Sequence, residues 1–358
     1  MSVGDPDLPT IDPIIENAVT NLYRGRTHYS PGRGEPALRQ TIADVETGAS
    51  GRLTQPDEVL VFPGATNAVF STLSCLLDPG DNMVVCDPCY VGYYGIFRTI
   101  GCSVTHVATD PANGFNVDPA AIEAVIREDT RVLLLNTPGN PGGNVIPEAD
   151  LARLAAFCLE RGVWLVCDEV YSMITFETPH VSVRRAAASL ENVIVIDGLS
   201  KSHAMTGWRL GWAVAEQRVI DTLLEFTSAT VFGCSQFIQD AAAFAMKNDG
   251  EYIAGITAEY QKRRDYACDR IDNIPGLICE RPAAGMFLMI DVSAISDDGA
   301  VFARRLLDEA KVSVLPGAGF GDVCRGHVRL SLTHGVETLS HAMDRIEAFA
   351  TSVVEQET

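Results

Sequence analysis

Short apolar runs alternate with amphipathic stretches along residues 59–215. Most of the runs are nearly continuous in Val, Ile and Leu, which is typical of strands that helices cover on both faces. The stretches between them, such as Pro147–Arg161, carry apolar residues at helical spacing. This alternation predicts an α/β fold with a mostly parallel, seven-stranded sheet between helices. The predicted strands are Val59–Phe62, Met83–Cys86, Val104–Val107, Val132–Leu135, Trp164–Cys167, Val193–Ile196 and Leu210–Val214.

The pattern changes after residue 215, where it is helical to about residue 274, and a shorter mixed segment follows. This segment predicts a smaller α+β domain, so we expect a large domain at 16–262 and a small domain made of 1–15 and 263–358. Its predicted strands are Leu277–Glu280, Met286–Asp291, Val312–Leu315 and Val328–Leu332, with helices at Ala300–Ala310 and from Gly335 onward.

Composition narrows the class of protein. The chain has 358 residues, of which 47% are hydrophobic and 21% charged, as in an ordinary globular protein that buries a core without disulfides or metals. The formal net charge of −20 argues against nucleic acid and anionic membranes as partners. An acidic balance favours a cationic substrate as one explanation and solubility as another, and solubility is the simpler of the two.

The ten cysteines show no repeated spacing, and the close pair Cys86 and Cys89 has no second pair or His cluster to complete a metal site. The first 25 residues hold acidic side chains and no apolar run, so no signal peptide is predicted. No stretch approaches the roughly 18 apolar residues of a membrane span. We therefore expect a cytoplasmic protein without a metal.

A lysine motif gives the first indication of chemistry. Gly198-Leu-Ser-Lys201-Ser-His-Ala-Met-Thr-Gly-Trp-Arg209 follows a predicted buried strand. Lysine forms Schiff bases, and desolvation lowers its pKa toward that use. A guanidinium eight residues later suits bidentate binding of a phosphate. A solvated surface lysine is the alternative, but an ammonium among small residues at a buried strand end is costly.

Polar residues also follow three other predicted strands, where ligands of α/β sheets bind. Asp168-Glu-Val-Tyr171 follows one of them, and Asp168 is either a helix cap or the partner of a buried cation. Asn136-Thr-Pro-Gly-Asn140-Pro-Gly-Gly follows a second as a turn-rich loop. Pro63-Gly-Ala-Thr66 precedes an amphipathic run, so it forms either a simple N-cap or a helix start that binds phosphate.

Together these motifs resemble those of the class I aminotransferases of pyridoxal 5′-phosphate (PLP) fold type I, from residue 4 to beyond residue 330. The resemblance implies that Lys201 holds PLP as a Schiff base. It implies that Asp168 pairs with the pyridine nitrogen, while Tyr171 and Asn140 donate to the phenolic oxygen. Tyr90 would stack on the ring, whereas Tyr93 and Tyr94 are predicted to be packing residues. The implied phosphate ligands are Ala65, Thr66, Ser200 and Arg209.

The resemblance also implies substrate contacts and a partner subunit. Arg329 would bind the substrate α-carboxylate, beside the backbone of Gly4, although an edge-strand charge is the alternative for an arginine in this strand. Tyr29, in a Gly/Pro loop, would reach the phosphate of the neighbouring subunit, so we expect a homodimer with a composite active site.

Three departures from the family pattern stand out. Gly142 replaces the usual Thr in the loop of Asn140, and Gly198 replaces a Ser that is common in relatives. Only three residues precede Gly4, where relatives usually have a further N-terminal segment. A misassigned start, a trimmed chain and a branch without this segment all explain the difference.

The implied activity is transfer of an amino group from an L-amino acid to a 2-keto acid with ping-pong kinetics, in which Lys201 is the general base. The arginine–pyruvate transaminase branch is the one that three segments resemble most: Ser202–Arg209, Phe237–Ala242 and Gly285–Phe287. This suggests a basic or neutral amino acid as donor and pyruvate or 2-oxoglutarate as acceptor.

Carbon–sulfur lyases, racemases and amino-acid oxidases use the same residues and remain alternatives. A PLP-sensing regulator would need a DNA-binding module, for which we expect no room in the short acidic start. A nicotinamide dehydrogenase would need a Gly-x-Gly-x-x-Gly motif after a strand, which is missing.

Overall fold

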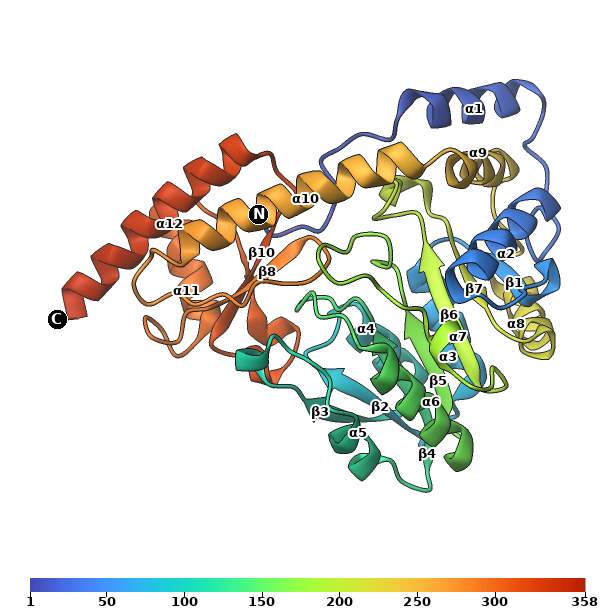
Figure 1. Ribbon diagram of the computed structural model, residues 1–358, viewed down its shortest axis with the longest axis horizontal. Coiled ribbons are helices and arrows are strands. Elements are labelled where there is room, and N and C mark those ends of the chain that lie inside the picture. Colours follow the sequence, from blue (N-terminus) through green and yellow to red (C-terminus); the bar gives the residue numbers. More distant parts are fainter. Residues whose placement is uncertain (358) are drawn as a thin grey trace.

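The computed structural model describes residues 1–357, and its largest feature is a seven-stranded sheet (Figure 1). The strand order is β1-β7-β6-β5-β4-β2-β3, and every predicted strand of this sheet is confirmed within one or two residues. The bounds are β1 Val59–Phe62, β2 Asn82–Asp87, β3 Ser103–Ala108, β4 Thr130–Asn136, β5 Trp164–Asp168, β6 Val193–Gly198 and β7 Gly211–Val214.

Five neighbouring strands, from β3 to β6, run parallel, and β7 lies antiparallel to both β6 and β1. The carboxyl ends of β4, β5 and β6 therefore lie at one edge of the sheet, where the register pairs Asn136 with Asp168 and Asp168 with Ile196. This arrangement brings together three loops that are far apart in the sequence, and these loops carry the predicted site residues Asn140, Tyr171, Ser200 and Lys201.

Helices cover both faces of the large sheet, as the apolar runs predict. α3 (Ala65–Leu76), α4 (Tyr93–Ile100) and α8 (Gln217–Thr230) pack on one face, against alternate strand residues such as Leu134 and Ile194. The opposite face packs against five further helices. These are α2 (Pro36–Ser50), α5 (Pro119–Val125), α6 (Glu148–Arg161), α7 (Val183–Ala186) and α9 (Gln236–Lys247), and α1 (Asp12–Tyr23) lies outside α9.

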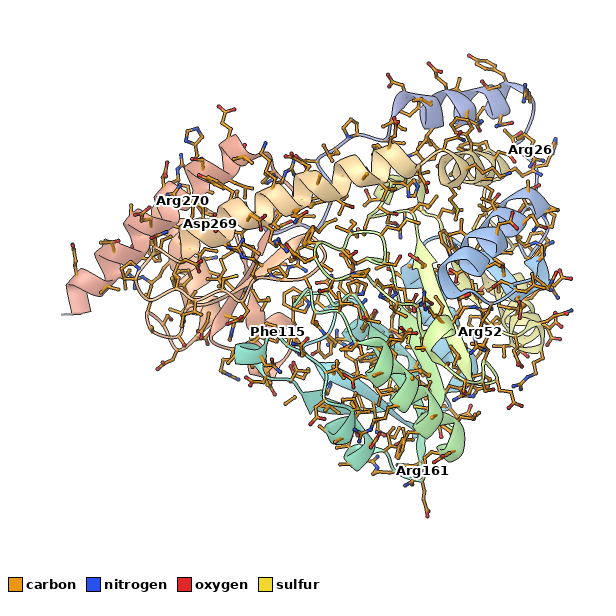
Figure 2. The ribbon with its side chains drawn as sticks, viewed as in Figure 1. Arg26, Arg52, Phe115, Arg161, Asp269 and Arg270 are labelled. Atoms are coloured by element: carbon orange, nitrogen blue, oxygen red, sulfur yellow. The ribbon has the colours of Figure 1, made fainter. Side chains whose placement is uncertain are left out.

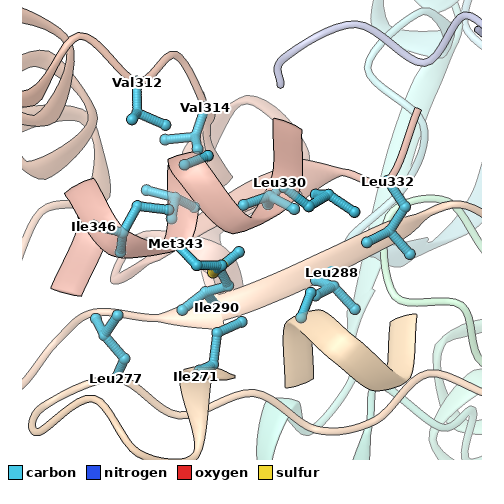
Figure 3. Packing of buried hydrophobic residues seen from close by; sticks show 14 of the residues in the cluster. Ile271, Leu277, Leu288, Ile290, Val312, Val314, Leu330, Leu332, Met343 and Ile346 are labelled. Carbon is cyan, nitrogen blue, oxygen red and sulfur yellow. The ribbon is translucent and has the colours of Figure 1, made fainter. Parts of the chain in front are cut away.

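A second core surrounds a three-stranded antiparallel sheet of order β8-β10-β9. The strands are β8 Phe287–Asp291, β9 Leu315–Pro316 and β10 His327–Ser331. Figure 3 shows side chains of β8 and β10 packed between α10 (Gly250–Ile271) and α12 (Val336–Glu357). α11 (Gly299–Arg305) continues as a π-helical turn at Leu306–Ala310, so the predicted helix at Ala300–Ala310 is confirmed with a wider last turn.

Two predicted strands of this second unit are wrong or shortened. Leu277–Glu280 forms no strand, because only Ile278 bridges to Asp291 and its side chain is largely exposed. In Val312–Leu315 only Leu315 joins a strand, opposite Arg329. The next backbone N–H on that edge of β10, that of Ser331, donates to Met1 instead, and the buried side chains of Val312 and Val314 pack in the core.

α10 connects the two sheets, and ion pairs fix it on the second one. Arg270 of α10 pairs with Asp344 and Glu347 of α12 at 2.8 and 3.0 Å, and Figure 2 shows it where these helices lie side by side. The predicted domain boundary at 262/263 falls inside this helix and remains a prediction. Within residues 1–357, none of the helices combines the length and apolar character needed to cross a bilayer.

Candidate active site

A cavity of about 660 Å³ opens between the two sheets, at the carboxyl ends of β4, β5 and β6. All the predicted site residues except Tyr29 line it, although they come from segments up to 325 residues apart. They are Gly4, Ala65, Thr66, Tyr90, Asn140, Asp168, Tyr171, Ser200, Lys201, Arg209 and Arg329. Among the described residues, no group of three or more His, Cys, Asp or Glu side chains is placed to hold a metal.

Lys201 follows β6 and is half-buried in this cavity. Its Nζ donates to the backbone carbonyl of Gly4 at 2.5 Å. Burial lowers the pKa of Lys201 to about 8, because an ammonium is poorly solvated there, and Arg329 and Arg209 lower it further while Asp5 raises it. Far more of this amine is therefore neutral near physiological pH than for an ordinary lysine, as a nucleophile or general base requires.

Asp168 ends β5 and is 6% exposed. Its Oδ1 accepts from the backbone N–H of Val170 at 3.2 Å, and its Oδ2 accepts from the hydroxyl of Tyr93 at 2.5 Å. Burial raises its pKa to about 6, because a carboxylate is poorly solvated there, and no basic side chain of the described chain pairs with it. No helix begins at Asp168, so the helix-cap alternative is wrong. A buried carboxylate without a cationic partner in the described chain suits a cationic ring N–H, as the predicted contact with PLP requires.

The start of α3 suits a phosphate. Gly64 precedes the helix without any capping side chain, so Thr66 is not the N-cap, and the first amide N–H groups of α3 are left for a ligand. Gly64 has φ +92°, and a Cβ there would lie 2.6 Å from Nη2 of Arg209. Arg209 itself adopts the left-handed conformation, with φ +52°, which is rare for a residue with a side chain. The missing Cβ thus makes room for the guanidinium beside the helix start.

Arg329 and Asn140 meet across the cavity from different sheets. Nη1 of Arg329 donates to Oδ1 of Asn140 at 2.9 Å, and Nη2 donates to the carbonyl of Ser2 at 3.1 Å. The guanidinium also stacks on Phe287, 3.9 Å from the ring centroid. Because Arg329 lies on the central strand β10 and is 4% exposed, the edge-strand alternative is wrong.

Tyr93 was predicted to be a packing residue, and this prediction is incomplete. Its ring does pack in the core, but its hydroxyl also binds Asp168. Tyr90, three residues earlier, is half-buried and lines the cavity, with its ring edge-on to Tyr93 at 5.3 Å. Tyr94 donates to the carbonyl of Phe320 at 3.0 Å and does not line the cavity.

Tyr29 lies outside the cavity of its own chain. It is 82% exposed, in the loop between α1 and α2, with its ring edge-on to Phe232 at 4.9 Å. Tyr171, in contrast, is buried against Phe287, and burial raises the pKa of its hydroxyl, so this group is a hydrogen-bond donor at neutral pH.

The sequence did not identify several cavity residues. Asn136 accepts from the backbone N–H of Asn140 at 2.8 Å and donates to the backbone carbonyl of Asp168 at 2.9 Å, so it braces two site loops. Asp5 and Phe287 also line the cavity. A signal existed for Asn136, because an Asn that ends a buried strand needs partners for its amide. Phe287 gave no such signal.

Comparison with known proteins agrees with this geometry. A family model, aminotransferase class I and II, matches residues 1–346. The arginine–pyruvate transaminase AruH of Pseudomonas aeruginosa is 38% identical over 356 residues, covering 99% of this chain and 91% of that relative. An aspartate aminotransferase of Musicola paradisiaca is 34% identical, covering 96% of this chain and 86% of its own length.

Solved structures of aminotransferases have the same fold. The aspartate aminotransferase of Thermus thermophilus, in complex with maleate, superimposes with a TM-score of 0.92 at 33% identity, covering 97% of this chain and 90% of its own. The aromatic aminotransferase of Pyrococcus horikoshii gives a TM-score of 0.95 at 30% identity, covering 98% and 94%. The chain therefore belongs to the class I and II aminotransferases and is a PLP-dependent transaminase of fold type I.

Proposed function

We propose that this aminotransferase takes the amino group of a basic or neutral L-amino acid, such as arginine, and passes it to pyruvate or 2-oxoglutarate. The observation that carries this proposal is the charge of the cavity wall. Within the described residues, the basic side chains that line it are Lys201, Arg209 and Arg329. Each of them has a role below, so this chain offers no further cation for a side-chain carboxylate.

Asp5 supports the same substrate class. It lines the cavity with an exposed carboxylate, whose Oδ1 accepts from the hydroxyl of Thr206 at 2.6 Å. An exposed carboxylate at a cavity mouth favours a cationic group over an anionic one. The 38% identity to an arginine–pyruvate transaminase is in line with this assignment.

We assign the cofactor contacts as follows. Ala65 and Thr66 at the start of α3, with Ser200 and Arg209, bind the phosphate, because free amides and a guanidinium meet there. Asp168 pairs with the pyridine nitrogen, and Tyr90 stacks on the ring. Tyr171 and Asn140 donate to the phenolic oxygen, since Asn140 already uses its amide oxygen for Arg329.

Substrate binding and proton transfer then depend on four residues. Arg329 binds the α-carboxylate, beside Asn140 and the backbone of Gly4, and thereby orients the Cα hydrogen. Bound PLP supplies an electron-withdrawing ring that stabilises negative charge at Cα. Nζ of Lys201, whose pKa is lowered by burial, takes the proton from Cα and returns it on the cofactor side of the site.

A homodimer with a composite active site is part of the proposal. Tyr29 and Phe232 form an aromatic pair that is 82% and 56% exposed, and α1, which precedes the Tyr29 loop in the chain, exposes Ile15 and Val19. Large apolar side chains gathered on a surface are typical of subunit interfaces. A second copy that covers them would place Tyr29 at the phosphate of its partner.

We also propose that the enzyme acts in the cytoplasm. All ten cysteines are free thiols, and Cys86 and Cys158 are among those whose pKa burial raises, so they stay protonated and unreactive. A chain with this many unpaired thiols fits a reducing compartment.

An absorbance panel tests the function. The PLP-loaded protein is mixed with single amino acids while its visible band is followed, and products are analysed with and without keto acid. We expect arginine or a neutral amino acid to bleach the band and pyruvate to yield alanine, with no change in Lys201→Ala. Asp5→Asn should lower kcat/KM for arginine about tenfold relative to a neutral donor. Aspartate as the best donor would contradict the substrate class, whereas sulfide, D-amino acid or peroxide without keto acid would contradict transamination.

A further inference from the structure

Tyr93 joins two groups that the proposed function places on the cofactor ring. It is the first residue of α4, and its side chain is 2% exposed. Its hydroxyl donates to Oδ2 of Asp168 at 2.5 Å, and its ring lies edge-on to Tyr90, with an interplanar angle of 90°. Within the described chain, Tyr93 is the residue that contacts both of these side chains, Asp168 by a hydrogen bond and Tyr90 by a ring pair.

We propose that Tyr93 is a positioning residue for the amino-transfer reaction, which keeps the Asp168 carboxylate ionised and aimed at the pyridine nitrogen while it fixes the ring of Tyr90. This inference rests on the proposed function, because it needs Asp168 at that nitrogen. Through Asp168, Tyr93 would influence the protonation state of the pyridine nitrogen, which determines how strongly the ring withdraws electrons from Cα.

The geometry determines how Asp168 is held. The backbone N–H of Val170 donates to Oδ1 and the phenol of Tyr93 donates to Oδ2, so hydrogen bonds to both oxygens fix the plane of the carboxylate. A hydrogen bond to the ionised form of a buried carboxyl stabilises that form. At Asp168, burial raises the pKa, whereas the bonds from Tyr93 and Val170 lower it. Tyr93 therefore opposes the effect of burial and keeps the carboxylate available as an anion.

The other titratable groups near Asp168 do not replace this bond. Glu169 is a neighbouring carboxylate, which raises the pKa of Asp168, and it is itself 3.1 Å from Nε2 of His180. Tyr171 and Cys167 are buried, and their pKa values are raised, so both remain neutral at pH 7. Tyr93 is thus the side chain that donates a hydrogen bond to the Asp168 carboxylate in the described chain.

Tyr93→Phe and Tyr94→Phe form a matched pair for the test. Each removes one hydroxyl and keeps the ring on α4, but the hydroxyl of Tyr94 binds the carbonyl of Phe320 and not Asp168. Three quantities are measured: the PLP dissociation constant, the pH at which the visible band of the loaded protein titrates, and kcat and KM separately. Circular dichroism and thermal melting report whether each variant is folded.

We expect Tyr93→Phe to raise the titration midpoint by about one pH unit and to lower kcat about tenfold, because a hydrogen bond to a charged group is lost. KM should change less than threefold, since Arg329 is untouched. Tyr94→Phe should leave all three quantities at wild-type values. In an Asp168→Asn background, Tyr93→Phe should add less than a twofold change, because its partner is no longer charged.

The outcomes separate this inference from the proposed function. A wild-type midpoint and kcat in Tyr93→Phe, or an equal shift in Tyr94→Phe, would refute the role of Tyr93 and leave the aminotransferase assignment intact. An additive effect in the Asp168→Asn background would also refute it. A wild-type protein that forms no visible band with PLP would instead refute the proposed site itself.

Discussion

Nη1 of Arg329 donates to Oδ1 of Asn140 at 2.9 Å, which links the central strand of the small sheet to the loop after β4 of the large sheet. Nη2 binds a backbone carbonyl, and the buried Nε has no hydrogen-bond partner within the described chain. Burial lowers the pKa of Arg329 to about 10, so the guanidinium is still charged at neutral pH. A buried cation with only neutral partners is costly to fold, and an anionic ligand between the sheets removes that cost.

Arg329→Lys is expected to raise KM for the amino donor about 100-fold, because an ammonium cannot form the planar, two-point contact of a guanidinium with a carboxylate. The PLP dissociation constant should stay within about twofold of wild type, since the phosphate lies at the start of α3. Steady-state kinetics and PLP titration measure the two effects. Arg325→Gln, on the exposed turn before β10, is the control and should leave both unchanged. Equal losses of PLP and substrate affinity in Arg329→Lys would argue against a carboxylate-binding role.

The lowered pKa of Lys201 predicts a pH profile for cofactor loading. Only the neutral amine attacks the PLP aldehyde, so the rate for the cofactor-free protein should rise with pH and level off above about pH 8. For N-acetyl-lysine amide as a model amine, the rate of reaction with PLP should keep rising up to about pH 10.4, the ordinary pKa of lysine. Stopped-flow absorbance measures both. Because the charge of Asp5 raises the pKa of Lys201, Asp5→Asn should move the plateau to lower pH. A protein profile that matches the model amine would show that burial does not tune this lysine.

The large sheet was predictable because each of its strands is a buried apolar run, whose period and length identify it without knowledge of its partners. Leu277–Glu280 and Val312–Leu315 look similar in sequence but lie at the edges of the small sheet. At a sheet edge, a segment forms a strand only where a neighbouring strand supplies backbone N–H and C=O groups to pair with. The presence of such a neighbour depends on residues that are distant in the sequence. Composition and periodicity do not contain this information.

The site was predictable where a side chain lies at the end of a strand, as Asp168 does, or shortly after it, as Lys201 does, because strand ends of a parallel sheet converge. Tyr93 was underestimated because its hydroxyl partner lies 75 residues further along the chain. The general tendency of buried tyrosines to bind through their hydroxyl was the available signal, but it does not name the partner. The predicted role of Tyr29 cannot be seen in a single chain, because Tyr29 does not line the cavity of its own subunit.

Gly64→Ala should weaken PLP binding at least about tenfold, because the added Cβ displaces the guanidinium of Arg209 from the phosphate position. Gly101→Ala is the matched control, since Gly101 also has a positive φ, of +78°, but nothing lies within 4 Å of its added Cβ. Gly101→Ala should lose about 1 kcal/mol of unfolding free energy from its left-handed backbone, and Gly64→Ala about 1–3 kcal/mol, because φ +92° with ψ 154° is a region that essentially only glycine adopts. Equilibrium titration with PLP and thermal melting separate the two effects. Equal PLP affinities in the two variants would mean that Arg209 does not need this space.

A subunit-mixing experiment tests the composite site. Tyr29→Phe and Lys201→Ala are produced together with different tags, and the heterodimer is purified through both tags. If Tyr29 reaches the partner's phosphate, one of the two sites combines an intact Lys201 with an intact Tyr29, and the heterodimer should have about half of the wild-type activity at limiting PLP. The Lys201→Ala homodimer should be inactive, and the Tyr29→Phe homodimer should need about tenfold more PLP, because a hydrogen bond to the phosphate is missing. Were Tyr29 to serve its own chain, the heterodimer's active site would carry the Tyr29→Phe defect, and its PLP requirement would equal that of the Tyr29→Phe homodimer. The exposure of Tyr29 in the single chain favours the first result, since a side chain that stands 82% in solvent has no contact with the cavity of its own subunit.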